Sequence, residues 1–446
     1  MRGVLGWGVH VPHRRLDRTQ IAAIAGTGGG KGTRAVASYD EDSTTMAVEA
    51  ARACLASVDV APDTVWFATT SPTYLDKTNA TAIHAALRLD RSATAYDAVG
   101  SVRSAVAVLR AAGESRKPAL AVTSDMRVGR PGSPDEASGG DAAAALLWGN
   151  DTDGALVAEF VAYAGVTDEF VDRWRVPGDA GSKLWEERFG ETKYGPLAAE
   201  ALKPALGYAG IGPESVDALV VAGLHERACA AAAKASGVAE DKIVDRMSAT
   251  VGNPGAAQPI LLLARALERA TPGQTIVVLV LSDGADAFVV KTTDAIASYR
   301  PRRLVGAEAL AGAPVSYGRY LSWRGLLPVE PPRRPEPARP SSSAAGRSTD
   351  WKFGLEGPGG VLADQLGPVP PFPLAQLAYS QSPQVVFEVV AFDDGQRLPV
   401  ELTDVDAEEV AIGMRVEMTF RRLFTADGIA NYFWKARPTR VEEDNS

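Results

Sequence analysis

The feature that most constrains the fold is a pattern that occurs twice along the chain. Residues 64–123 read as strand, helix, strand, helix, strand, and the same order recurs over residues 216–283. Strands that alternate with helices predict parallel β-α-β units whose sheets are covered by helices. The repeat therefore predicts two similar halves with mixed, mainly parallel sheets and buried central helices.

A sharp turn in the first half is the first candidate for a site. In "TAYDAVGSVRSAVAVLRAA" (residues 94–112) a strand pattern gives way at Gly100 to an apolar run with helical spacing. Such a turn projects a side chain, while the helix N-terminus offers unpaired N–H groups and a positive dipole end to an anion. The candidate side chains are those of Ser101, Val102 and Ser104, and none is a cysteine. The repeat makes this turn the counterpart of residues 251–253.

Composition changes after the repeat. The chain has 446 residues, so two or three domains are expected. Residues 328–348 are rich in Pro, Arg and Ser and predict a linker. Short alternating strands beyond it predict a small all-β barrel. The predicted domains are 1–165 (N-terminal half), 166–300 (C-terminal half), 301–350 (connector and linker) and 351–440 (barrel).

Charge and apolar content limit the partners. The formal net charge of −9 argues against nucleic acid or an anionic membrane as the main partner, although small anions can bind in a local basic pocket. No signal-peptide pattern and no run of 18 apolar residues occurs, so a cytoplasmic location is expected. Cys54 and Cys229 lie in Ala-rich helical patterns, which predicts small core residues and no structural disulfide.

Several longer motifs resemble a known family. Over residues 1–295, "SYDEDSTTMAVEAARACL", "DEFVDRWR", "ERFGETKYGPLAAEALKPAL", "GNPGAA" and "SDGADAFVV" occur in the order found in the hydroxymethylglutaryl-CoA synthase branch of the thiolase superfamily. This resemblance implies an α/β fold with a duplicated α-β-α-β-α core. Residues 350–440, especially "ELTDVDAEEVAIGMRVEMTFRR", resemble the OB-fold part of zinc-ribbon/OB proteins that accompany thiolases. Residues 351–374 lack the ribbon cysteines, so no structural zinc is expected.

The resemblance also locates catalytic positions, and the chain departs from most of them. The family's acyl-accepting cysteine falls on Val102, which would only shape the surroundings of an acyl chain. Its acid/base glutamate falls on Thr70 or Ser71.

The remaining two family positions lie in the second half. The family histidine falls on Ala222, with His225 three residues along, and only the asparagine of the "GN" turn is kept, as Asn253. Three of the four catalytic positions therefore differ from the family pattern.

Each candidate side chain has a functional and a structural interpretation. Ser101 is either a nucleophile without an evident base or a helix-cap serine, and His225 either faces a cleft or caps a helix. The Asn253 amide either orients a thioester carbonyl or water, or supports a turn.

Three longer side chains complete the set. Tyr194 is a candidate acid/base that needs no covalent intermediate. Arg103 and Arg175 either pair with a phosphate or carboxylate of the ligand or are ordinary surface arginines.

Two classes of function follow from these residues. The first is an acyl-CoA or acyl-carrier thioester enzyme that makes or breaks a C–C bond by cysteine-independent aldol or retro-aldol chemistry, with Asn253, His225 and Tyr194 in the reaction. The second is a non-catalytic thioester-binding scaffold for a partner enzyme, and a serine acyltransferase is a weaker third option. No cofactor or metal is expected, and a homodimer is expected in which strand 118–125 pairs across a two-fold axis.

Overall fold

The computed structural model describes residues 1–330, 360–365, 386–393, 395 and 397–439. The chain divides into two compact units, each of which is described by itself. The core unit comprises Met1–Val36 and Met46–Tyr317, and the barrel unit comprises Ala37–Thr45 and Gly318–Ser446. Among the described residues, no helix combines the length and the apolar character needed to cross a membrane.

A nine-stranded mixed sheet organises the core unit, in the order β11-β12-β13-β8-β1-β7-β6-β4-β5. Its strands are β1 (Arg2–His10), β4 (Thr64–Thr69), β5 (Thr94–Val99), β6 (Ala119–Met126), β7 (Asp141–Asn150), β8 (Ala158–Thr167), β11 (Ala218–Gly223), β12 (Thr275–Leu281) and β13 (Gly284–Thr292). The longer helices are α2 (Ser43–Leu55), α3 (Ala80–Ala86), α4 (Arg103–Glu114), α6 (Glu187–Ala209), α7 (Glu226–Ala235) and α8 (Gln258–Arg269).

Smaller elements lie around this sheet. They are β2 (Arg14–Asp17), β3 (Thr33–Val36), β9 (Arg173–Trp174), β10 (Lys183–Leu184), β14 (Ala313–Pro314), α1 (Thr19–Ala25), α5 (Pro134–Ser138) and α9 (Val305–Leu310). Helix α10 (Tyr317–Trp323) belongs to the barrel unit from Gly318 onward. Strands β14, β2 and β3 form a three-stranded sheet, and β9 pairs with β10.

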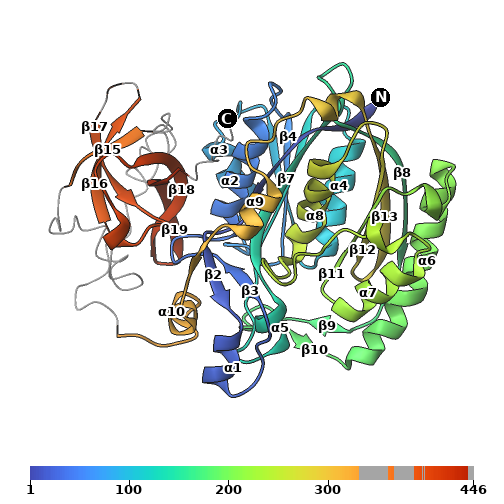
Figure 1. Cartoon of the computed structure of the whole chain (residues 1–446), viewed down its shortest axis with the longest axis horizontal. Helices are drawn as coiled ribbons and strands as arrows, with labels where there is room; N and C mark the ends of the chain where they lie inside the picture. The colour runs from blue at the N-terminus through green and yellow to red at the C-terminus, as the bar shows by residue number, and fades with distance from the viewer. Residues whose placement is uncertain (331–359, 366–385, 394, 396, 440–446) are drawn as a thin grey trace. The chain divides into compact units, whose positions relative to one another are not determined.

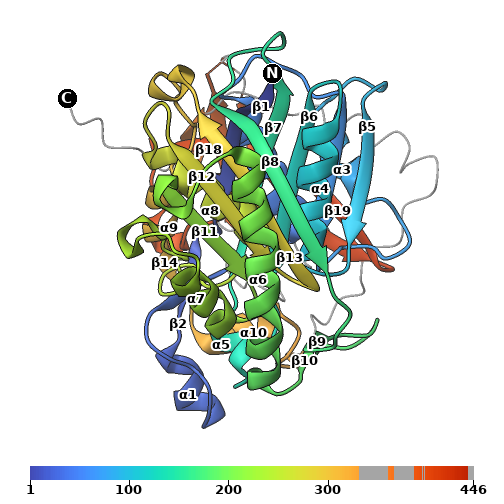
Figure 2. The ribbon, with the colours of Figure 1, turned by 90° about the vertical axis from the view of Figure 1, so that its right-hand side faces the viewer.

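The helices and strands of the core unit form the predicted α-β-α-β-α layers. Helices α4 and α8 lie between the strands of the first half and the strands of the second half. Helices α6 and α7 cover the outer face of β8 and β11–β13 (Figures 1 and 2). The first seven residues of α8 are all buried, which suits a helix with protein on every side. Helix α4 buries one stripe, with Ala105, Val108 and Ala112 fully covered.

The duplication is visible in the strand pairing. In the first half β4 pairs in parallel with β5 and β6, and β7 runs antiparallel to β6. In the second half β11 pairs in parallel with β12, and β13 runs antiparallel to β12. The counterpart of β5 is reduced to one parallel bridge between Leu219 and Ile243. The predicted boundary between residues 165 and 166 falls inside β8, which pairs with β13 and β1.

The strand expected at a dimer interface lies inside the sheet. Strand β6 is hydrogen-bonded to β4 on one side and to β7 on the other, so it cannot pair across a two-fold axis. Residues 119–125 are fully buried, and their low charge reflects a central strand covered on both faces. The open edge belongs to β5, where Tyr96 and Val99 are exposed. The expectation that the strand at 118–125 forms the interface was therefore wrong.

The barrel unit contains a small closed barrel, as the OB-fold resemblance implied. Its strands are β15 (Gly360–Gln365), β16 (Val386–Phe392), β17 (Arg397–Leu402), β18 (Arg415–Ala426) and β19 (Ile429–Pro438), in the order β15-β16-β17-β19-β18. Asp427 and Gly428, both with positive φ, form the two-residue turn between β18 and β19, a favoured hairpin connection. Most of the predicted linker and most of the segment 351–374 lie outside the described residues.

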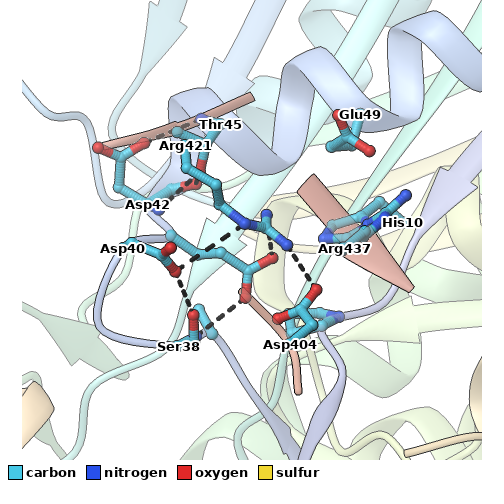
Figure 3. Close-up of polar contacts among 12 residues, drawn as sticks. His10, Ser38, Asp40, Asp42, Thr45, Glu49, Asp404, Arg421 and Arg437 are labelled. Atoms are coloured by element: carbon cyan, nitrogen blue, oxygen red, sulfur yellow. Dashed lines mark hydrogen bonds and ion pairs between the residues drawn. The ribbon is translucent and has the colours of Figure 1, made fainter. Parts of the chain in front are cut away.

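A buried ionic network lies within the barrel unit. Arg421 on β18 bonds to the carboxylates of Glu41 and Asp404 at 2.7 and 2.6 Å (Figure 3). Lys435 on β19 bonds to Asp40 at 3.0 Å and also to Glu401. Burial alone would raise the pKa of Asp40, but Lys435 and Arg421 lower it to about 2. Asp40 and Glu41 of "SYDED" are thus paired with cations inside the barrel unit.

Further hydrogen bonds hold the same short segment. The Tyr432 hydroxyl donates to Asp42 Oδ2 at 2.9 Å, and the Arg422 amide donates to the Asp40 carbonyl at 2.8 Å. Residues 37–45 therefore belong with the barrel through backbone and side-chain bonds together.

We expect removal of Arg421 to destabilise the barrel unit strongly. Arg421→Ala leaves Glu41 and Asp404 buried without their cation, and losing one partner of a buried ion pair costs about 3–5 kcal/mol. Arg415→Ala is the matched control, because its pair with Asp393 is about half exposed and such pairs contribute about 0–1 kcal/mol. Urea unfolding of the full chain, followed by tryptophan fluorescence, measures both. Equal losses in the two variants would contradict the assignment.

Candidate active site

The predicted strand-to-helix turn is present, with Val102 at the position of the family cysteine. Strand β5 ends at Val99, Gly100 has φ +139°, which favours glycine, and α4 begins at Arg103 with Val102 as its N-cap residue. The Val102 side chain is buried in the core. The Ser101 hydroxyl accepts a hydrogen bond from the Arg103 amide at 3.3 Å, as a helix-capping serine does.

Arg103 joins this turn to the second half of the core unit. Its Nε atom lies 3.1 Å from Asp286 Oδ2, and its Nη2 atom donates to the Val166 carbonyl at 3.0 Å. Its Nη1 atom donates to the carbonyl of Asp283. The guanidinium that was a candidate for ligand binding has protein partners on three of its nitrogens.

A buried carboxylate fixes the end of β4. Asp125, the next-to-last residue of β6, accepts from the Thr69 hydroxyl at 3.0 Å and from the Thr70 amide and hydroxyl at 2.6 and 2.8 Å. It also accepts from the Ala256 amide at 2.7 Å, in the 3₁₀ turn Gly255–Ala257 that precedes α8. Ser71 accepts from the Met126 amide at 3.0 Å. Thr70 and Ser71 are thereby held beside the turn that follows Asn253.

Asn253 uses its amide to join two loops. Its Nδ2 donates to the Gly223 carbonyl at 2.8 Å, and its Oδ1 accepts from the Gly255 amide at 3.0 Å. The side chain is buried, and its backbone amide bonds to the Ser138 carbonyl. Nδ2 carries a second proton, which has no partner among the described residues, and this is the group with which Asn253 can reach a ligand.

His225 caps helix α7. Its Nδ1 accepts from the Ala228 amide at 3.1 Å, and its Nε2 lies 2.8 Å from the Glu187 carbonyl. These two partners assign a neutral imidazole with the proton on Nε2. Both ring nitrogens are thus engaged with backbone groups, which agrees with the capping interpretation.

Tyr194 lies against His225 in the core of the second half. Its ring centroid is 6.2 Å from that of His225, and the side chain is buried. Burial, followed by the charges of Asp172 and Asp283, raises the pKa of the phenol well above its usual range. A hydroxyl in this state keeps its proton and acts as a donor, and Asp172 is one of its partners.

These contacts bring most of the predicted site residues close to one another. Asp283 contacts both Arg103 and Tyr194, and Tyr194 adjoins His225. Asn253 bonds to Gly223, two residues before His225. The 3₁₀ turn after Asn253 contacts both α4 and β4. The structure therefore brings the elbow, Tyr194, His225, Asn253 and Thr70 into one region of the core unit.

Two arginines contact Thr70. Arg175, after β9, is exposed and donates to the Thr70 carbonyl. Arg127, after β6, lies 3.3 Å from the Thr70 hydroxyl. Arg173 bonds to Asp135.

Sequence reasoning missed Asp125, Asp283, Asp172 and Arg127. A signal for the first two was present, because matching strands of the two halves end in "TSD" and "LSD" at Asp125 and Asp283. Among the described residues, no group of three or more His, Cys, Asp or Glu is arranged to hold a metal.

The chain is similar in sequence to known families and proteins. Residues 206–290 match the family described as 3-oxoacyl-[acyl-carrier-protein (ACP)] synthase III C terminal. Residues 372–421 match the C-terminal OB-fold domain of ChsH2. The hydroxymethylglutaryl-CoA synthase of Aeropyrum pernix is 30% identical over 345 residues, covering 73% of this chain and 95% of the relative. That of Methanopyrus kandleri is 28% identical over 348 residues, covering 73% and 97%.

Solved structures agree in fold. MvaS in complex with 3-hydroxy-3-methylglutaryl coenzyme A matches with a TM-score of 0.61 and 21% identity, over 77% of this chain and 95% of that chain. FabH, the 3-oxoacyl-(acyl carrier protein) synthase III from Pseudomonas aeruginosa, matches with a TM-score of 0.57 and 21% identity, over 66% and 98%.

We expect both cysteines to be unreactive in the folded chain. Burial raises the pKa of Cys54 to about 12 and that of Cys229 to about 11, so almost no thiolate is present at pH 8. Iodoacetamide at pH 8, followed by intact mass measurement, should leave the native chain unmodified and label both thiols in urea. Labelling or acylation of either thiol in the native chain would show that it is accessible.

Proposed function

The chain belongs to the hydroxymethylglutaryl-CoA synthase family, and on this premise we propose that it makes or breaks a C–C bond in an acyl thioester without a covalent acyl-enzyme. One observation carries the proposal: the elbow keeps its strand–glycine–helix geometry, while the residue at the helix N-cap is Val102. Such an elbow can bind a thioester beside a helix N-terminus but cannot accept its acyl group. The ligand is an acyl-CoA or acyl-carrier thioester, and no further cofactor is invoked.

The proposed chemistry is an aldol or retro-aldol reaction. In the cleavage direction Asp172 takes up the proton of the substrate's β-hydroxyl and the Cα–Cβ bond breaks, which releases an aldehyde or ketone. The electron pair passes to the thioester as an enolate, which then takes up a proton at Cα. Charge develops on the thioester oxygen, where the second Nδ2 proton of Asn253 and the positive end of α4 would stabilise it.

We assign the protonation of the enolate at Cα to Tyr194 and its partner Asp172. Tyr194 keeps its proton because burial raises its pKa, and it adjoins His225 and the elbow contacts of Arg103. A retained phenol proton suits a donor to the enolate carbon. We place His225 as the neutral group that positions the start of α7 beside Tyr194.

A second candidate function is favoured by a different observation. Ser101 and His225 are both engaged in helix caps, and Arg103 is engaged by Asp286 and two carbonyls. These polar side chains are bonded to other groups of the protein. A chain of this kind suits a thioester-binding scaffold that presents its ligand to a partner enzyme. Such a scaffold binds the thioester without turnover.

We also propose a homodimer through the β5 edge and a cytoplasmic location. Strand β5 leads directly into the elbow, so pairing at this edge would place two elbows near the subunit boundary. Exposed main-chain groups on an edge strand favour addition of another strand.

We expect Tyr96→Asp to yield a monomer, because a charge replaces an exposed aromatic side chain on the β5 edge. Tyr208→Asp, at an exposed tyrosine of α6, should leave the dimer intact. Light scattering after size exclusion measures both masses. A monomeric unmodified chain, or a dimeric Tyr96→Asp variant, would count against this interface.

Turnover of a β-hydroxyacyl-CoA separates the two functions. We expect release of a carbonyl product with the protein mass unchanged, and a loss of about 10²–10³ in rate in Asn253→Asp, which lacks the amide donor. Asn150→Asp, at the half-buried end of β7, is the matched control. Binding without turnover in the unmodified chain would support the scaffold instead. A mass adduct mapped to Ser101 would identify a serine acyltransferase.

A further inference from the structure

Arg103, the first residue of α4, is held by three groups of the second half of the core unit. Its Nε atom lies 3.1 Å from Asp286 Oδ2, and its other two nitrogens donate to the carbonyls of Asp283 and Val166. Because every nitrogen of the guanidinium has a protein partner, Arg103 fixes the start of α4 against β8 and the β12–β13 turn.

Asp286 on β13 is the charged member of this set, and it is buried, with 1% of its surface exposed. A buried carboxylate is costly unless it is paired and hydrogen-bonded. Its Oδ1 accepts from the Tyr163 hydroxyl on β8 at 2.5 Å, and its Oδ2 faces Arg103. Burial, followed by this hydrogen bond, raises the pKa of Tyr163 to about 12, so the phenol keeps its proton and stays a donor. Asp286 therefore bridges β8 to the first turn of α4.

Tyr163 contacts α4 a second time. The guanidinium of Arg110, about two turns along α4 from Arg103, lies 4.3 Å from the centroid of the Tyr163 ring. The other neighbour of this ring is Phe288 on β13, at a centroid distance of 5.0 Å. The pair of Tyr163 and Asp286 thus holds α4 at two points along its length.

Two glycines leave the space that these contacts need. A Cβ atom at Gly165 would overlap with both the Tyr163 hydroxyl and Asp286 Oδ1. Gly284 has φ +131°, and a Cβ atom there would lie 3.0 Å from Arg103 Nη1. A side chain at either position would displace the groups that hold α4.

The same β12–β13 turn also contacts the proposed proton donor. Asp283 has φ +49°, which is uncommon for a residue other than glycine. Its carbonyl accepts from Arg103, and its backbone also hydrogen-bonds to the Tyr194 phenol. The position of the elbow relative to Tyr194 is therefore set through this turn.

We propose that Asp286 is a positioning residue for the reaction, which acts through Arg103 to hold the N-terminus of α4 in place relative to Tyr194. Donors that are already oriented stabilise a developing charge without reorganisation, and small displacements of such groups reduce the rate strongly. Asp286 acts through Arg103 because both of its oxygens bond to protein groups. This inference rests on the proposed function, which places the developing charge at the start of α4.

Kinetics of the full chain with a β-hydroxyacyl-CoA test this role. We expect Asp286→Asn, which removes the charge and keeps the size, to lower kcat by roughly tenfold to a hundredfold with KM unchanged, because transition-state stabilisation is lost. Tyr163→Phe keeps the ion pair and should lower kcat by a smaller factor, about threefold to tenfold. Asp217→Asn is the matched control, because that carboxylate accepts from the Thr275 amide at the opposite end of β12.

A double-mutant cycle separates positioning from a general loss of stability. If Asp286 acts through Arg103, Asp286→Asn should lower kcat no further in an Arg103→Met background. Amide hydrogen exchange should become faster in residues 100–106 of Asp286→Asn, while α8 stays protected. Should Asp286→Asn fail to fold, Tyr163→Phe carries the same measurements.

The contrary outcomes are distinct. An unchanged kcat in Asp286→Asn, or a rise in KM alone, would overturn the positioning role while leaving the proposed function intact. Losses that multiply in the double variant would show that Asp286 does not act through Arg103. Absence of turnover in the unmodified chain would overturn the proposed function and this role together.

Discussion

The arrangement of the candidate site depends on one buried carboxylate, that of Asp125. A carboxylate removed from water is costly unless donors surround it, and here hydroxyl and amide groups of Thr69, Thr70 and Ala256 supply them. Because those donors come from β4 and from the turn before α8, a single side chain on β6 fixes two other segments. Asn253, just before that turn, is positioned as a consequence.

The equivalent position in the second half has a different role. Asp283 follows β12 as Asp125 ends the buried part of β6, but it lies in a turn with φ +49° and uses its carbonyl to accept from Arg103. One half therefore uses the side chain at this position to hold its own strands, and the other uses the backbone to hold the elbow of its counterpart. The two halves of the duplicated fold therefore differ in the role of this position.

Local patterns predicted much of this fold, and long-range pairing accounts for the parts that they missed. Hydrophobic spacing and strand–helix order located the two halves, the elbow and the barrel, because these signals lie within short windows. The order of strands in the sheet is set by pairing between distant segments. For this reason β6, which was expected at an interface, is a central strand, and β5 lies at an edge. The partner of Arg421 is 380 residues away, so nothing near "SYDED" indicated that the segment belongs with the barrel.

The site residues show the same difference between local and long-range contacts. The capping roles of Ser101 and His225 were among the interpretations that the sequence allowed, because a cap bonds within a few residues. The partners of Arg103 lie 63 to 183 residues away, and no local pattern could identify them.

The net charge of the whole chain does not predict the charge at the candidate site. The chain carries a formal charge of −9, yet Arg127 and Arg175 both contact Thr70, and Asp135 is the carboxylate in ion-pair contact with Arg127. Part of the negative charge is buried as paired groups, such as Asp40 and Glu41 in the barrel unit, where it is compensated by Lys435 and Arg421. A local field is set by charges that lack a close partner, so an acidic chain can still offer a cationic surface to a small anionic ligand.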